Sequence, residues 1–145
     1  MSVSGPGRSP IVFVDTSAFL GMASRRDKHH QRAKTVQAQS VAERWQFVST
    51  NFIIAETHAL ALRRHDPRLA LALVEDLLSA ATVIVRVNEE DERRALEILR
   101  RYDDKRFSYT DATSFAVMER LAIGQAFTFD RHFAQYGFQV VGLGA

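Results

Sequence analysis

The stretch Ile11-Val12-Phe13-Val14-Asp15-Thr16-Ser17 places four apolar residues directly before an acid and two hydroxyl residues. Pro10 precedes the run and the polar cluster closes it, so the apolar segment has the length of one strand. A continuous apolar run is typical of a strand buried on both faces of a parallel sheet. Asp15 is therefore expected at the carboxyl end of a central strand, the edge at which open α/β sheets bind ligands.

The remainder of the chain alternates helical patterns with short β-branched or aromatic runs. The expected strands are 11–14, 47–48, 82–87, 126–129 and 138–141, and the expected helices are 18–23, 28–44, 52–64, 69–80, 88–102 and 110–121. Gly124 is expected to end the last of these helices. Strands separated by helices indicate an α/β fold with a mostly parallel sheet.

Size and composition are those of one globular domain, with 145 residues of which 46% are hydrophobic and 25% charged. Residues 1–10 contain two glycines and two prolines and are expected to form a flexible tail, followed by a single domain over residues 11–145. The absence of cysteine excludes disulfides, zinc-thiolate sites and thiol catalysis. No apolar run approaches the ~18 residues that span a membrane, and no signal-peptide pattern is present, so we expect a cytoplasmic protein without a membrane partner.

The formal net charge of +2 conceals a strong preference for arginine. Lys and Arg total 19 against 17 acids, and only Lys28, Lys34 and Lys105 are lysines. If several acids gather around a metal ion, the remaining surface is clearly positive. Arginine makes bidentate contacts with phosphate, so the composition hints at a polyanionic partner, although pairs such as Arg63-Arg64 also occur on solvated helix faces.

Three acids besides Asp15 occupy unusual positions. Glu56 lies in an apolar helical segment, one turn after Phe52 and one turn before Leu60, on the same helix face. Asp111 lies in the first turn of its helix, and Asp130 follows the strand 126–129. Structural explanations exist for each: Asp15 and Asp130 as helix N-caps, Asp111 as half of a capping box with Ser108, and Glu56 as a solvated side chain.

The four acids are expected to lie at the same edge of the sheet, because the carboxyl ends of parallel strands and the helices that follow them meet there. Four carboxylates within a few ångströms cannot all ionise unless a cation compensates them. Oxygen ligands without His or Cys select Mg²⁺ or Mn²⁺. Such ions support phosphoryl chemistry because they activate water and neutralise the leaving oxygen.

The segments Val14-Asp15-Thr16-Ser17, Ala55-Glu56, Thr110-Asp111-Ala112 and Thr128-Phe129-Asp130, in this order, resemble the PIN domain family. In size the chain is similar to the VapC-type toxins of that family, and the resemblance extends from about Ile11 to Val141. It implies a three-layer α/β/α sandwich with a central, mostly parallel sheet. It also implies an endoribonuclease that cleaves single-stranded RNA with Mg²⁺ or Mn²⁺ as the toxin of a toxin-antitoxin pair.

The resemblance also assigns roles to individual residues. It makes Asp15, Asp111 and Asp130 direct metal ligands and Glu56 a ligand through water, the four together forming the catalytic site. The hydroxyls of Thr16, Ser17 and Thr128 match positions that shape the pocket. Asp103 and Asp104, in the loop before Asp111, are expected to stay outside the site. The family further implies a homodimer and an antitoxin protein that silences the enzyme.

Other phosphate-handling folds fit less well. A haloacid-dehalogenase-type phosphatase needs a second acid two positions after its nucleophile, where this chain has Ser17. A receiver domain needs an acidic pair at its first strand and a lysine after its last strand, and none of the three lysines lies there. A helical zinc site needs two histidines at helical spacing, which Glu56-Thr57-His58 lacks. Two alternatives stay open: a non-catalytic PIN module that binds RNA or a protein, and a PIN nuclease of RNA processing.

Overall fold

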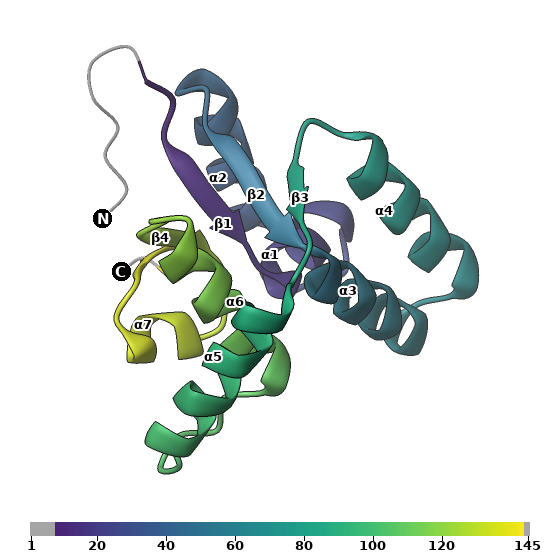
Figure 1. The fold of residues 1–145 in the computed structure, drawn as a ribbon. Helices are drawn as coiled ribbons and strands as arrows, with labels where there is room; N and C mark the ends of the chain where they lie inside the picture. Colours follow the sequence, from purple (N-terminus) through teal and green to yellow (C-terminus); the bar gives the residue numbers. More distant parts are fainter. Residues whose placement is uncertain (1–7, 144–145) are drawn as a thin grey trace.

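A parallel sheet organises the computed structural model, which describes residues 8–143 (Figure 1). Residues 1–7 of the predicted tail lie outside the described residues. The strands are β1 (Ile11–Val14), β2 (Gln46–Thr50), β3 (Val83–Val85), β4 (Gln125–Phe127) and β5 (Gln139–Val141). The helices are α1 (Thr16–Ala23), α2 (His30–Ala42), α3 (Asn51–Arg64), α4 (Pro67–Ser79), α5 (Glu89–Arg101), α6 (Tyr109–Arg120) and α7 (His132–Tyr136).

Strand β1 is the centre of the sheet, whose order is β3-β2-β1-β4-β5. Every pair of neighbouring strands is parallel. Val12, Phe13 and Val14 alternate between the two faces, and each is 0% exposed. Helices therefore cover both faces, which confirms the predicted three-layer α/β/α fold and the place of strand 11–14 within it.

The strand order reverses at β1. From β1 the chain passes through α1 and α2 to β2 on one side, and it reaches β4 on the other side only after α6. Val14 pairs with Phe127, and the Asp15 amide donates to the Phe127 carbonyl at 3.1 Å. The carboxyl ends of β1 and β4 therefore lie side by side at a topological switch point, where open α/β sheets form ligand-binding crevices.

Helix α6 is buried along most of its length, from Asp111 to Met118. It packs against α5, and the two helices lie together in Figure 1. The Arg120 guanidinium makes a bidentate contact with the buried carboxylate of Asp91, with both nitrogen-oxygen distances at 2.8 Å. This pair lowers the pKa of Asp91 despite the opposing effect of burial. A charge-assisted bidentate contact thus locks α6 to α5 and fixes the helix that carries Asp111.

Some element boundaries differ from the predicted ones. Helix α1 begins at Thr16 rather than Ala18, because the hydroxyls that suggested a loop find partners elsewhere in the fold. Strand β4 ends at Phe127, two residues before the predicted end. Gly124 does not end α6: the helix stops at Arg120, and Ala122 adopts the left-handed conformation with φ 56°. Across residues 8–143, no helix combines the length and apolarity that crossing a membrane requires.

Candidate active site

An open cavity of about 830 Å³ lies at the carboxyl ends of β1 and β4. All four acids singled out by the sequence line it: Asp15, Glu56, Asp111 and Asp130. They come from four separate segments, namely the β1–α1 junction, α3, the first turn of α6 and the connection from β4 to α7. The fold therefore gathers side chains that are far apart in the sequence around one space.

Asp15 is buried at the floor of this cavity, with 5% of its surface exposed. It occupies the N-cap position of α1, but its side chain makes no capping hydrogen bond, so the capping explanation is wrong for this residue. Its Oδ2 instead accepts from the Thr128 hydroxyl at 2.8 Å and from the Ser17 hydroxyl at 3.1 Å. Burial raises the pKa of Asp15 to about 7, the charges of Asp111 and Glu56 act in the same direction, and the Thr128 hydrogen bond opposes them.

The three predicted supporting hydroxyls all make contacts within the site. Thr128 Oγ1 accepts the Asp130 amide at 2.9 Å, and Ser17 Oγ accepts the Phe129 amide at 2.9 Å. These two bonds fix the backbone that follows β4. The Thr16 hydroxyl donates to Glu56 Oε1 at 2.6 Å and so ties α1 to α3.

Glu56 projects from α3 into the cavity and is half-buried rather than fully solvated. Burial raises the pKa of its carboxyl, the Thr16 hydrogen bond opposes that shift, and the charges of Asp111 and Asp130 add to it. The Glu56 side chain is therefore held on the cavity by Thr16 and is not a fully solvated surface glutamate.

Asp111 combines the capping role and the cavity position that the sequence left as alternatives. Its Oδ2 accepts the Ser108 amide at 2.9 Å, and its own amide donates to the Ser108 hydroxyl at 2.9 Å, which completes a capping box. The same Oδ2 lies 2.7 Å from His132 Nδ1. Burial raises the pKa of Asp111, although the hydrogen bonds from Ser108 and His132 oppose the shift. The capping box thus holds the carboxylate at the edge of the cavity.

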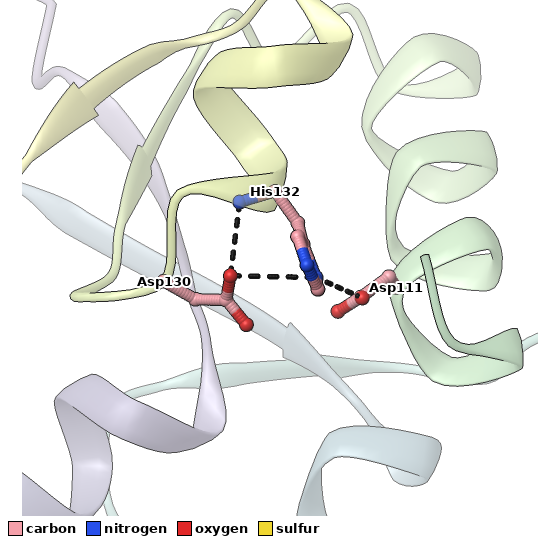
Figure 2. Close-up of side chains that lie close together, drawn as sticks. All are labelled: Asp111, Asp130 and His132. Carbon is pink, nitrogen blue, oxygen red and sulfur yellow. Dashed lines mark hydrogen bonds and ion pairs between the residues drawn. The ribbon is translucent and has the colours of Figure 1, made fainter. Parts of the chain in front are cut away.

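His132 is the residue that the sequence analysis missed, and Figure 2 shows its ring between Asp111 and Asp130. Its Nδ1 lies 3.3 Å from Asp130 Oδ1, and its backbone amide donates to the same oxygen at 2.9 Å. Within residues 8–143, Asp111, Asp130 and His132 form the one group of three metal-binding side chains whose ligand atoms all lie within 4.8 Å of one another. The available signal was the sequence Asp130-Arg131-His132 at the start of a helix.

Asp103 and Asp104 are both exposed, and neither lines the cavity. The Asp104 carboxylate lies 3.5 Å from Lys105 Nζ. Both acids thus lie outside the site.

The sequence matches the family described as PIN domain over residues 12–139. The chain belongs to the PIN domain family. This membership confirms the resemblance that was based on the four acidic segments.

Two relatives share a third of their residues with this PIN domain. The "23S rRNA-specific endonuclease VapC20" of Mycobacterium tuberculosis is 34% identical over 128 residues, which is 88% of this chain and 95% of the relative. The crystal structure of VapC20, described as a "Sarcin-Ricin loop cleaving toxin", matches with a TM-score of 0.81. The "VapC ribonuclease" of Archaeoglobus fulgidus is 32% identical over 124 residues, covering 83% of this chain and 78% of the relative. The DNA-bound VapBC structure from Salmonella typhimurium shares the fold at 13% identity, with a TM-score of 0.64 over 91% of this chain and 96% of that one.

The cavity of this PIN domain has a cationic rim, which we define as Arg26 and Lys28 from the α1–α2 connection together with Arg64 at the end of α3. No carboxylate among residues 8–143 forms an ion pair with Arg26, Lys28 or Arg64. The His29 ring stacks on Phe129 with the ring centres 4.3 Å apart. The cavity thus carries basic side chains beside its four acids, with one further acid, Asp27, between Arg26 and Lys28.

Proposed function

We propose that this PIN domain is an endoribonuclease that cleaves single-stranded RNA with Mg²⁺ or Mn²⁺ and serves as the toxin of a toxin-antitoxin pair. The observation that carries the proposal is the meeting of four acids from four segments on one open cavity at the switch point of the sheet. The relatives described above, a VapC ribonuclease and a 23S rRNA-specific endonuclease, support RNA as the substrate.

The donor set of the cavity fits a hard divalent cation. Carboxylate oxygens predominate. Burial raises the pKa values of Asp15, Glu56 and Asp111, and repulsion from neighbouring carboxylates adds to the shift, so a cation that compensates these charges is favoured. We assign Asp15, Asp111 and Asp130 as direct ligands and Glu56 as a ligand through water. When bound, the ion supplies an activated water and positive charge at the phosphate.

The side chains around the ligands position the reacting groups. Thr128 and Ser17 orient the Asp15 carboxylate, and Thr16 engages Glu56 Oε1. Glu56 Oε2 has no hydrogen-bond partner among the described residues. This oxygen is therefore free to orient an attacking water on the cavity side.

The cationic rim supplies the attraction for a polyanion. Arginine and lysine neutralise backbone phosphates whatever the base sequence. Arg26, Lys28 and Arg64 line the same cavity as the four acids, so an RNA strand that they bind lies close to the acids. The acidic floor and the basic rim together favour a phosphodiester as the bond that is attacked.

An antitoxin protein and a homodimer are the partners that we propose. VapC20 is described as a toxin, and a cell that makes a ribonuclease of this kind needs an inhibitor for it. Light scattering of the purified chain tests the dimer, and a mass equal to one chain would contradict it.

The decisive experiment is cleavage of a labelled single-stranded RNA in millimolar Mg²⁺ or Mn²⁺, with and without EDTA. We expect cleavage in either metal, no cleavage in EDTA, and no cleavage by an Asp15→Asn protein that folds normally. Asp104→Asn removes a carboxylate outside the cavity and is the matched control, expected to cleave like the wild type. If Asp15→Asn cleaves as fast as the wild type, the proposal is wrong, and RNA that is bound but never cleaved would favour a non-catalytic binding module.

A further inference from the structure

Two of the spacings among three candidate ligand atoms on the cavity match those expected around a single metal ion, and all three atoms lie within 4.8 Å of one another. His132 Nδ1 lies 2.7 Å from Asp111 Oδ2 and 3.3 Å from Asp130 Oδ1 (Figure 2). Neighbouring ligands of an octahedral ion with bonds of about 2.1 Å lie about 3 Å apart. Nδ1 therefore stands at ligand spacing from both carboxylates.

Contacts that do not involve Nδ1 help to hold the ring in this place. The His132 amide donates to Asp130 Oδ1, which anchors the first residue of α7. The imidazole packs edge-on against Phe107, with ring centres 5.6 Å apart and an interplanar angle of 73°. The side chain is 27% exposed, so solutes can reach it from the cavity. The ring can therefore keep its position when Nδ1 exchanges one partner for another.

We propose that His132 Nδ1 is a direct ligand of the divalent ion and makes this site prefer Mn²⁺ to Mg²⁺. The inference rests on the proposed function for the presence of a metal at the cavity. Mg²⁺ is bound almost entirely through oxygen, whereas the transition-metal ion Mn²⁺ also accepts an imidazole nitrogen beside its oxygen ligands. An added nitrogen thus strengthens binding of Mn²⁺ and contributes little to binding of Mg²⁺.

A purely structural role for His132 makes a different prediction. In that case its Nδ1–H only donates to the Asp111 carboxylate and orients it, as a ring outside the coordination sphere would do. His132→Asn separates the two roles, because the asparagine amide can present a donor near the position of Nδ1 but offers no nitrogen that binds metal. His65→Gln is the matched control, since His65 also lines the cavity but is not part of the three-residue group.

The experiment is pulsed electron paramagnetic resonance on the full chain loaded with Mn²⁺, combined with calorimetric titrations of Mn²⁺ and Mg²⁺. We expect nitrogen hyperfine coupling to Mn²⁺ in the wild type and in His65→Gln, and its loss in His132→Asn. Affinity for Mn²⁺ should fall roughly tenfold in His132→Asn, while affinity for Mg²⁺ changes by less than about twofold because oxygen ligands dominate its binding.

The wild-type spectrum decides the question even if a variant does not fold. Bound Mn²⁺ without nitrogen coupling would overturn the role of His132 and leave the proposed metal-dependent nuclease intact. Nitrogen hyperfine coupling to Mn²⁺ that persists in His132→Asn would also overturn the assignment of His132 as a metal ligand. Failure of the wild type to bind either metal would instead contradict the proposed function itself.

Discussion

The Thr128 hydroxyl donates to Asp15 Oδ2 at 2.8 Å, although the two residues are 113 positions apart in the chain. Asp15 follows the central strand and Thr128 follows its neighbour β4, so the bond joins the two strand ends that flank the switch point. The same hydroxyl accepts the Asp130 amide. One threonine thus fixes two of the acids relative to each other.

Thr128→Val should weaken both the fold and the site. Valine keeps the shape of threonine but leaves the Asp130 amide without its acceptor and the Asp15 carboxylate with Ser17 as its remaining hydroxyl donor, which costs about 1–3 kcal/mol. Urea unfolding measures this loss, and RNA cleavage should fall as well. Thr113→Val is the control, because Thr113 is equally buried and its hydroxyl donates to the Thr110 carbonyl, away from the acids. Unchanged stability and cleavage in Thr128→Val would contradict this assignment.

Without metal, the free energy of unfolding should decrease as pH rises from about 5 to about 8. Asp15 has a pKa of about 7 in the folded state against an ordinary value of 3.8, so the folded chain keeps a proton that the unfolded chain has released. The resulting stability is complete below about pH 4 and is lost as pH rises through about 7, a change of roughly 4 kcal/mol for this group. The pKa values of Asp111 and Glu56 are also raised in the folded state, so these two groups also lower the free energy of unfolding as pH rises.

Urea unfolding in EDTA at several pH values checks this expectation. Asp15→Asn should flatten the dependence, because the amide does not titrate. In the wild type, metal at one hundred times its dissociation constant should restore ~2.7 kcal/mol. A metal-free wild type whose stability increases between about pH 5 and about pH 8 would show that Asp15 is not the buried acid described here.

Replacing Asp15 and Asp130 together by Asn should tighten RNA binding in EDTA while it abolishes cleavage. At about pH 8 the metal-free carboxylates repel the phosphate backbone, at about 1 kcal/mol for each carboxylate in water, so removing both should raise the affinity roughly thirtyfold. The control is the double variant Asp103→Asn with Asp104→Asn, which makes the same change in net charge outside the cavity. Equal gains in the two double variants would mean that RNA does not pass over the acids.

Arg64→Gln should weaken RNA binding and reduce its dependence on salt. Each phosphate contact on a single strand contributes about 0.7 to the slope of log K against log salt, so the slope should fall by about that amount. Arg100→Gln removes an exposed arginine of α5 that does not line the cavity and serves as the control. If both variants keep the wild-type slope, the cationic rim does not contact the RNA backbone.

Much of this architecture could be predicted because it depends on local pattern. The apolar run before Asp15 has no polar face, so it fits only the middle of a covered sheet, and β1 is central. Parallel strands then bring their carboxyl ends to one edge, which is why Asp15 and Asp130 line one cavity although the predicted end of β4 was two residues too late.

The place of His132 could not be predicted from local pattern. Its ring contacts Asp111, which is 21 residues away on another helix. No periodic pattern in the sequence predicts a contact between these two residues. The start of α1 was missed for a related reason. Thr16 and Ser17 have the composition of a loop or cap, but their hydroxyls contact Glu56 and Thr128 across the fold, which leaves their backbone free to be helical.

The position of β4 and β5 late in the chain has a consequence for protein synthesis. Asp15, Glu56 and Asp111 are translated well before Asp130, and the segment that carries Asp130 is held by the Thr128 amide donating to the Val141 carbonyl of β5. Domains fold as units, so a nascent chain that still lacks β5 can already contain all four acids without the folded cavity that they share. The cavity is therefore expected to be complete only after β5 has left the ribosome, however early its first three acids are translated.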